Sequence, residues 1–232
     1  MKSILITGAS SGIGEATAKV FLQSGWRVGL VARRADRLEA LAQDHANAVV
    51  LPADVTDAQA MAEAFARFGD LDVLFNNAGI FGPSAPIDEV ALEDWDRVLA
   101  VNLGGMFIAA RLAFGAMRKN GRGGRIINNG SISAHTPREN SVCYTTTKHA
   151  ITGLTKSLAL DGRPFDITAG QIDIGNAESE IVAGLKAAHP GTQTMDVAHA
   201  AASVFHMAQL PLSANVPFMT VMATKMPYLG RG

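Results

Sequence analysis

Three polar residues near the middle of the chain have the types and spacing for chemistry on a carbonyl group: Ser131, Tyr144 and Lys148. If a helix begins near Val142, Tyr144 and Lys148 are four residues apart and lie on one face of it. A phenol is a poor proton donor or acceptor at neutral pH, but a neighbouring cation favours the phenolate and improves the match. Ser131 follows an apolar run and could hydrogen-bond the substrate oxygen that Tyr144 protonates. This set suits interconversion of a carbonyl and an alcohol.

A tyrosine and a lysine at this spacing are weak evidence alone, because on most helices they are an exposed ring beside a solvated charge. The amino terminus adds a second signal. An apolar run at residues 2–6 is followed by Thr-Gly-Ala-Ser-Ser-Gly-Ile-Gly at residues 7–14 and a helix-like segment at 15–24. Glycines allow close approach, and free N–H groups at a helix start face an anion, as a dinucleotide pyrophosphate requires. The Gly-x-x-x-Gly-x-Gly spacing differs from the usual dinucleotide fingerprint, and a plain structural turn is the alternative.

Two arginines end the second predicted strand, where NAD enzymes commonly carry an acid for the ribose 2′-hydroxyl. Guanidinium groups of Arg33 and Arg34 would attract a 2′-phosphate, so the sequence favours NADP over NAD, with NAD still possible. The alternative is that both arginines are solvated and Asp36 takes the role of the acid. Asp54, at the end of the third strand, could face the adenine or cap the helix that begins near Asp57.

Two asparagine positions complete the set of polar candidates. The fourth strand ends in Asn-Asn-Ala-Gly at 76–79, a small-residue turn that lets a cofactor lie close. Asn102 lies among apolar residues with a helical period over 92–107, and a buried amide must find partners. Satisfaction by local backbone is an equally good reading of Asn102.

Strands and helices alternate along the chain, which predicts an α/β fold: one Rossmann-like, doubly wound parallel sheet with helices on both faces, over residues 1–232 as a single domain. The expected strands are residues 2–6, 26–32, 49–54, 71–75, 125–130, 164–174 and 216–222. The site is expected at the carboxyl ends of these strands.

With these motifs in place, the chain resembles the short-chain dehydrogenase/reductase family. The resemblance covers about the first two-thirds of the chain, from residues 7–14 through 76–79 and Asn102 to Ser131, Tyr144 and Lys148. It implies that Tyr144 is the general acid in reduction and the base in oxidation, and that Ser131 positions the carbonyl. Lys148 would bind the nicotinamide ribose and tune Tyr144, and Asn102 would hold a water for proton relay.

The resemblance also implies a set of cofactor contacts, with Asp54 and the backbone near Asn76 at the adenosine half. The expected cofactor-binding residues are Gly8, Ser10, Ser11, Gly12, Ile13, Gly14, Arg33, Arg34, Asp54, Val55, Asn76, Ala78, Gly79, Tyr144, Lys148 and Ile174.

The chain departs from the family after the sixth strand, where members usually have a Pro-Gly pair lining the nicotinamide site. Here residues 169–177 read Ala-Gly-Gln-Ile-Asp-Ile-Gly-Asn-Ala, without proline. Gly175, Asn176 and residues 178–185 are expected to form a short, mobile substrate lid. Phe81 and Ile132 are expected to be pocket walls. Arg138 is interpreted as an exposed loop charge balanced by Glu139 rather than as an anion site.

Composition limits the partners. A net charge of −1 in 232 residues gives no reason to expect nucleic acid or an anionic membrane as a partner. A start directly in a strand and no apolar run long enough to span a bilayer predict a soluble cytoplasmic protein. The lone Cys143 excludes an internal disulfide, and no metal site is expected, since the methionines fill the core. Apolar helices over 103–117 and 151–158 imply, by resemblance, a homodimer or homotetramer.

The expected function is therefore an oxidoreductase that uses NADP or NAD on a small carbonyl or alcohol substrate. A rival from another class is a cofactor-binding sensor or scaffold that keeps the motifs without turnover. An epimerase or dehydratase on the same scaffold is disfavoured by the small size and the short lid.

Overall fold

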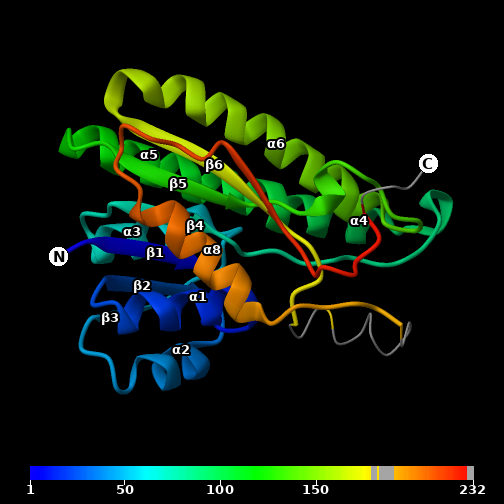
Figure 1. Ribbon diagram of the computed structural model, residues 1–232, viewed down its shortest axis with the longest axis horizontal. Helices are drawn as coiled ribbons and strands as arrows, with labels where there is room; N and C mark the ends of the chain where they lie inside the picture. Colours follow the sequence, from blue (N-terminus) through cyan, green and yellow to red (C-terminus); the bar gives the residue numbers. More distant parts are fainter. Residues whose placement is uncertain (179–181, 183–190, 229–232) are drawn as a thin grey trace.

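The computed structural model of the chain describes residues 1–178, 182 and 191–228, in which strands and helices alternate (Figure 1). The strands are β1 (Ser3–Thr7), β2 (Arg27–Ala32), β3 (Ala48–Pro52), β4 (Val73–Asn76), β5 (Gly124–Asn129), β6 (Ile167–Ile174) and β7 (Phe218–Val221). The helices are α1 (Gly12–Gln23), α2 (Ala35–Ala42), α3 (Ala58–Phe68), α4 (Leu92–Leu99), α5 (Met106–Asn120), α6 (Val142–Gly162) and α8 (Val197–Gln209). The expected lid at 178–185 lies mostly outside the described residues.

The seven strands form one sheet in the order β3-β2-β1-β4-β5-β6-β7, and every pairing is parallel. The predicted doubly wound α/β fold is thus confirmed. The chain runs outward from β1 in one direction and then from β4 in the other. The carboxyl ends of β1 and β4 therefore meet at the point where the strand order reverses, which is where open parallel sheets bind ligands.

Helices cover both faces of the sheet because the strand side chains alternate between them. On β1, Ile4 and Ile6 pack into the core cluster that includes α1, α2 and α8, whereas Leu5 packs into the cluster that includes α3 and α5. In Figure 1, α1 and α8 lie together against the sheet, with α5 at its other side. All five β1 residues are buried.

The sixth strand is shorter than the expected 164–174. A 3₁₀ turn, η4 (Arg163–Phe165), contains Pro164, and Asp166 then has a φ of 54°. This left-handed residue redirects the backbone, so the strand begins only at Ile167.

The helix expected over 92–107 is longer and is interrupted by a π-helical segment, η2 (Ala100–Gly105), between α4 and α5. Together they make one helical run from Leu92 to Asn120 that is long and apolar enough to cross a membrane by length and composition alone; it is the single such helix in the described ranges. This corrects the expectation that no apolar run is long enough to span a bilayer. A core helix of a soluble protein passes the same test, and Ala109, Ala113 and Met117 are packed in the core.

Candidate active site

The turn after β1 is shaped to admit an anion. Gly8 and Gly12 have φ values of 68° and 53°, in the left-handed region that favours glycine. A Cβ on Gly14 would lie 2.2 Å from the Gly8 oxygen, so the helix start packs directly on the turn. Ser11 precedes α1 and makes no side-chain cap, which leaves the first N–H groups of the helix to a ligand. The residues at this turn thus fit the pyrophosphate of a dinucleotide.

The turn after β4 is clamped to the turn after β1. Thr7 Oγ1 accepts hydrogen bonds from the N–H groups of Asn77 and Ala78, at 2.8 and 3.0 Å. The Asn76 side chain is buried and donates to the Met106 oxygen at 2.7 Å. This side chain therefore joins the end of β4 to the start of α5.

The two arginines after β2 have different surroundings. Arg34 lies against the phosphate turn, where its Nη2 and Nε donate to Ser10 Oγ at 3.0 and 3.2 Å. Arg33 is 74% exposed, and its Nη1 lies 3.8 Å from Asp54 Oδ2. Arg34 is thus the better placed of the two for a phosphate beside the turn.

Asp54 does not cap the helix that follows it. Asp57 is the cap of α3, because its side chain accepts from the N–H groups of Gln59 and Ala60. Asp54 instead accepts from the N–H and hydroxyl of Thr56, at 2.9 and 2.8 Å. Burial alone raises the pKa of Asp54, but these two hydrogen bonds and the nearby guanidinium outweigh it, so the pKa lies below its ordinary value of 3.8.

Tyr144 and Lys148 lie in the first two turns of α6, as expected for one helix face. Lys148 is 4% exposed; its Nζ donates to the Asn129 oxygen at 2.7 Å and lies 5.4 Å from the centre of the Tyr144 ring. The same ring stacks on Phe81, with centroids 4.3 Å apart and planes 13° apart. Among the described residues, the Tyr144 hydroxyl has no hydrogen-bond partner, which leaves it for a ligand.

Ser131 follows β5 and begins the 3₁₀ turn η3 (Ile132–Ala134). Its Oγ accepts from the Ser133 N–H at 3.1 Å, and its own N–H donates to Asp173 Oδ1 at 2.9 Å. Within the described part of the chain the Ser131 hydroxyl hydrogen has no acceptor, so it can be donated to a substrate oxygen.

Asn102 is buried in the π-helical segment, and both ends of its side-chain amide are hydrogen-bonded. Its Oδ1 accepts from the Ile80 N–H at 2.7 Å, and its Nδ2 donates to the Ile80 oxygen at 2.8 Å and to Thr147 Oγ1 at 3.2 Å. Ile80 and Thr147 lie 22 and 45 positions away, and one of the three bonds is to a side chain, so the alternative of satisfaction by local backbone is wrong. A water held near Asn102 stays a prediction.

The end of β6, where the proline is missing, is held by other contacts. Gly175 N–H donates to the Val221 oxygen, and Ala177 forms a parallel bridge with Met195. Met195 bonds to the Asn176 oxygen and the Glu178 N–H, so the N–H and C=O of Ala177 point away from Met195. The backbone is thus fixed without proline, next to the buried Ile174.

A cavity of about 320 Å³ lies between the loop after Ser131, the segment after β6 and the carboxyl-terminal part of the chain. Ile132, an expected pocket wall, lines it, together with Thr136, Asn176, Gln193 and Tyr228. Arg138 also lines it and donates to Asn176 Oδ1 at 3.2 Å, so it is not simply a solvated loop charge. A larger cavity, of about 420 Å³, lies between α1 and α2 near Ser10, away from Tyr144.

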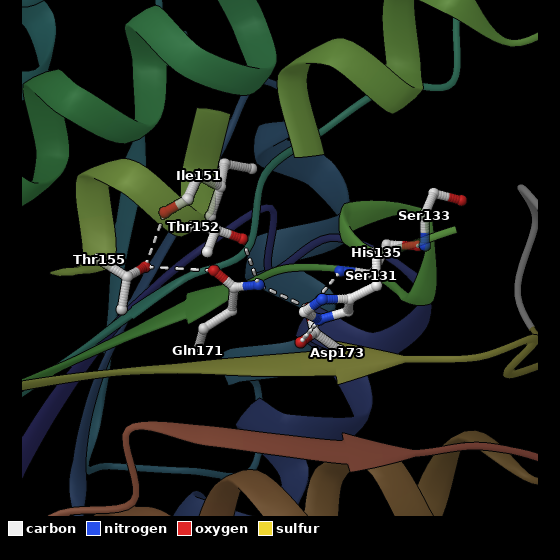
Figure 2. A network of polar contacts seen from close by, with 8 residues as sticks. All are labelled: Ser131, Ser133, His135, Ile151, Thr152, Thr155, Gln171 and Asp173. Carbon is white, nitrogen blue, oxygen red and sulfur yellow. Dashed lines mark hydrogen bonds and ion pairs between the residues drawn. The ribbon is translucent and has the colours of Figure 1, made fainter. Parts of the chain in front are cut away.

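Sequence reasoning missed two polar residues on β6 beneath Ser131, Asp173 and Gln171, and the contact of Asp173 with His135 (Figure 2). A signal was present, since Asp173 stands between two isoleucines in a buried strand. A buried carboxylate in such a run must be paired.

Comparison with known proteins agrees with this geometry. A family model for short chain dehydrogenases matches residues 2–190. The chain is 31% identical over 241 residues to a serine 3-dehydrogenase of Agrobacterium fabrum, covering 98% of this chain and 96% of that one.

Solved structures share the fold across nearly the whole chain. A closed form of serine dehydrogenase complexed with NADP⁺ superposes with a TM-score of 0.93 at 24% identity, covering 99% of this chain and 98% of that one. A 3-ketoacyl-(acyl-carrier-protein) reductase from Brucella melitensis complexed with NADH has a TM-score of 0.86 at 27% identity, covering 95% and 96%. The matched motifs, the sheet order and these likenesses lead to one conclusion: the chain belongs to the short-chain dehydrogenase family of nicotinamide-dependent oxidoreductases.

Proposed function

We propose that the chain interconverts a small or medium carbonyl compound and its alcohol, with NADP as the preferred cofactor and NAD as an alternative. The observation that carries this proposal is the position of Tyr144, whose ring has a buried ammonium at 5.4 Å and whose hydroxyl has no partner among the described residues. Such a phenol can pass a proton to or from a ligand.

The residues have separate roles in this proposal. The bound reduced nicotinamide would supply a hydride to the carbonyl carbon. Tyr144 gives its phenol proton to the substrate oxygen, and the Lys148 ammonium stabilises the phenolate that remains. The Ser131 hydroxyl donates a hydrogen bond to the same oxygen and so favours the charge that develops there.

The cofactor would lie across the switch point between β1 and β4. Residues 8–14 and the start of α1 hold the pyrophosphate, and Arg34 beside Ser10 supports a 2′-phosphate. Asp54, Val55 and the turn at 76–79 are assigned to the adenosine half. The N–H and C=O of Ala177 next to Ile174 are the proposed replacement for the usual Pro-Gly contact. The NADH complex of the Brucella reductase keeps NAD open.

The whole of residues 1–232 acts as one catalytic domain in this proposal, and a soluble nicotinamide cofactor fits the predicted cytoplasmic location. Phe107 on α5 and Leu160 on α6 are more than half exposed, which supports a homodimer or homotetramer. The serine dehydrogenase relative makes a 3-hydroxy acid a suitable first substrate.

The test is Tyr144→Phe, assayed with L-serine and NADP⁺ and with NADPH and a panel of ketones and aldehydes. Turnover should be abolished while NADPH binding, measured by fluorescence titration, stays nearly intact. Retained activity in Tyr144→Phe would refute the role. NADPH binding by the wild type without turnover on any probe would favour the sensor or scaffold instead.

A further inference from the structure

A carboxylate with no solvent exposure lies directly beneath Ser131. Asp173 Oδ1 accepts from the Ser131 N–H at 2.9 Å and from Gln171 Nε2 at 2.7 Å, and its Oδ2 lies 2.8 Å from His135 Nε2 (Figure 2). Three nitrogen atoms thus surround one carboxyl group. Carboxylate oxygens are hydrogen-bond acceptors, so the N–H groups of Ser131 and Gln171 both find a partner here.

The space for this carboxylate is built into the backbone. A Cβ on Gly130, the residue before Ser131, would lie 2.1 Å from Asp173 Oδ1 and 2.7 Å from Gln171 Nε2. Any side chain at position 130 would therefore push Asp173 away from Ser131. Because residue 130 is a glycine, the Asp173 carboxylate can lie against the end of β5.

The same carboxylate is connected to the helix that carries Tyr144. Gln171 Nε2 also donates to Thr152 Oγ1 at 3.1 Å, and Thr155 Oγ1 lies 3.4 Å from Gln171 Oε1. Thr152 and Thr155 lie on α6, two to three turns after Tyr144. Ser131 and Tyr144 come from different elements, and Asp173 with Gln171 joins those elements by hydrogen bonds.

The charge of Asp173 has one partner. Within ion-pair distance of it, among residues 1–178, 182 and 191–228, His135 is the single group that can carry a positive charge. His135 lies on the loop between Ser131 and Tyr144, and its side chain is 40% exposed. The contact therefore gives the buried carboxylate a polar partner and fastens this loop to β6.

We propose that Asp173, held by Gln171 and His135, is a positioning residue that fixes the Ser131 hydroxyl relative to Tyr144. It does not touch the substrate. Asp173 accepts a hydrogen bond from the Ser131 N–H and so fixes the Ser131 backbone. The Ser133 N–H donates to Ser131 Oγ, and the two bonds together fix the orientation of the hydroxyl. The inference rests on the proposed function, because it gives Ser131 and Tyr144 a common substrate oxygen.

The test compares Asp173→Ala with Asp173→Asn on whichever probe substrate the wild type turns over. Asp173→Ala should lower kcat about 100-fold, the loss typical of a reacting group displaced by roughly 1 Å, and leave the KM for NADPH unchanged. Asp173→Asn keeps an oxygen for the Ser131 N–H and should restore kcat to within about tenfold of wild type. Asp166→Asn, the same change just before β6 begins, is the matched control and should match the wild type.

His135→Ala provides a second variant, since a half-exposed loop residue can be removed without loss of folding. It should lower kcat less than Asp173→Ala does, again without a change in the KM for NADPH. The proposal is overturned if Asp173→Ala keeps its kcat, if Asp173→Asn is as slow as Asp173→Ala, or if His135→Ala matches the wild type.

A crystal structure of Asp173→Ala, or of His135→Ala should Asp173→Ala not fold, separates this proposal from the proposed function. The Ser131 hydroxyl should rotate or shift relative to Tyr144, and an unmoved hydroxyl would overturn the positioning role even if the protein turns over no probe. If the wild type turns over no probe but the Ser131 hydroxyl moves in the variant, only the proposed function is refuted.

Discussion

The ring of Tyr144 lies flat against the ring of Phe81, with centroids 4.3 Å apart and planes 13° apart. The backbone next to Phe81 is fixed, because Asn102 bonds to both the N–H and the oxygen of the preceding residue, Ile80. Asn102, Ile80 and Phe81 therefore form a continuous support for the phenol. Phe81, expected as a pocket wall, contacts the proposed acid itself.

Phe81→Leu should reduce kcat several-fold through misorientation of Tyr144. A stacked aromatic pair contributes about 0.5–1.5 kcal/mol beyond its buried area, and a leucine cannot define the plane of the phenol. Steady-state kinetics measures the effect. Phe114→Leu removes an edge-on aromatic contact to Phe165, remote from the site, and should leave kcat unchanged. Equal kcat in Phe81→Leu and wild type would show that the stack does not orient the phenol.

Cofactor preference should depend on Arg34 more than on Arg33. Arg34→Ala should weaken NADPH binding about 10- to 100-fold, the worth of a hydrogen bond to a charged group, and leave NADH binding nearly unchanged. Arg33→Ala should have a smaller effect, because Arg33 is exposed and lies near Asp54 rather than the phosphate turn. Fluorescence titration with both cofactors measures this. Tighter binding of NADH than of NADPH to the wild type would contradict the preference for NADP.

The fold and the proposed acid could be predicted because both depend on local patterns. Alternating strands and helices determine a parallel sheet, and the spacing of Tyr144 and Lys148 determines that they share a helix face. The glycine spacing at 8–14 likewise predicts a tight turn at a helix start, which the close packing of Gly14 on Gly8 confirms.

The polar support beneath the site could not be predicted, because its contacts join residues far apart in sequence. Ser131 and Asp173 are 42 positions apart, and which strand lies beside β5 follows only from the folded sheet. The alternative in which Asp54 caps α3 is wrong for a related reason, because Asp57 is the cap. Both residues precede the helix at short range, and only the backbone geometry shows which carboxylate reaches the free N–H groups.

Asp54 should contribute to stability at neutral pH but not in strong acid. Its pKa is lowered in the folded chain, so its contribution is present above the ordinary value of 3.8 and is lost as the pH falls through the folded pKa. Asp54→Asn should therefore lower the Tm at pH 7, and its difference from wild type should shrink below about pH 4. Thermal unfolding across pH 2–8 measures this. A difference that grows with acidity would reverse the sign and contradict the assignment.

Arg125 should be a stabilising residue without a role in turnover. It is 1% exposed at the start of β5, and its Nη2 donates to the oxygens of Leu210, Pro211 and Ala214 at 3.3, 3.2 and 2.8 Å. Burial lowers the pKa of Arg125, since a guanidinium loses solvation there.

Arg125→Met keeps an unbranched apolar stem, although a shorter one, and leaves those three carbonyl oxygens without their donor. The free energy of unfolding should fall by about 2–4 kcal/mol, because buried polar groups that lose a partner bear their full desolvation cost. Arg122→Met, which removes an exposed ion pair with Asp70, should change it by less than about 1 kcal/mol. Denaturant unfolding compares the two variants.

The kcat of folded Arg125→Met should match the wild type, because Arg125 lies at the amino end of β5 and Ser131 follows its carboxyl end. If Arg125→Met kept the free energy of unfolding of the wild type but lost its kcat, Arg125 would belong to the catalytic machinery instead.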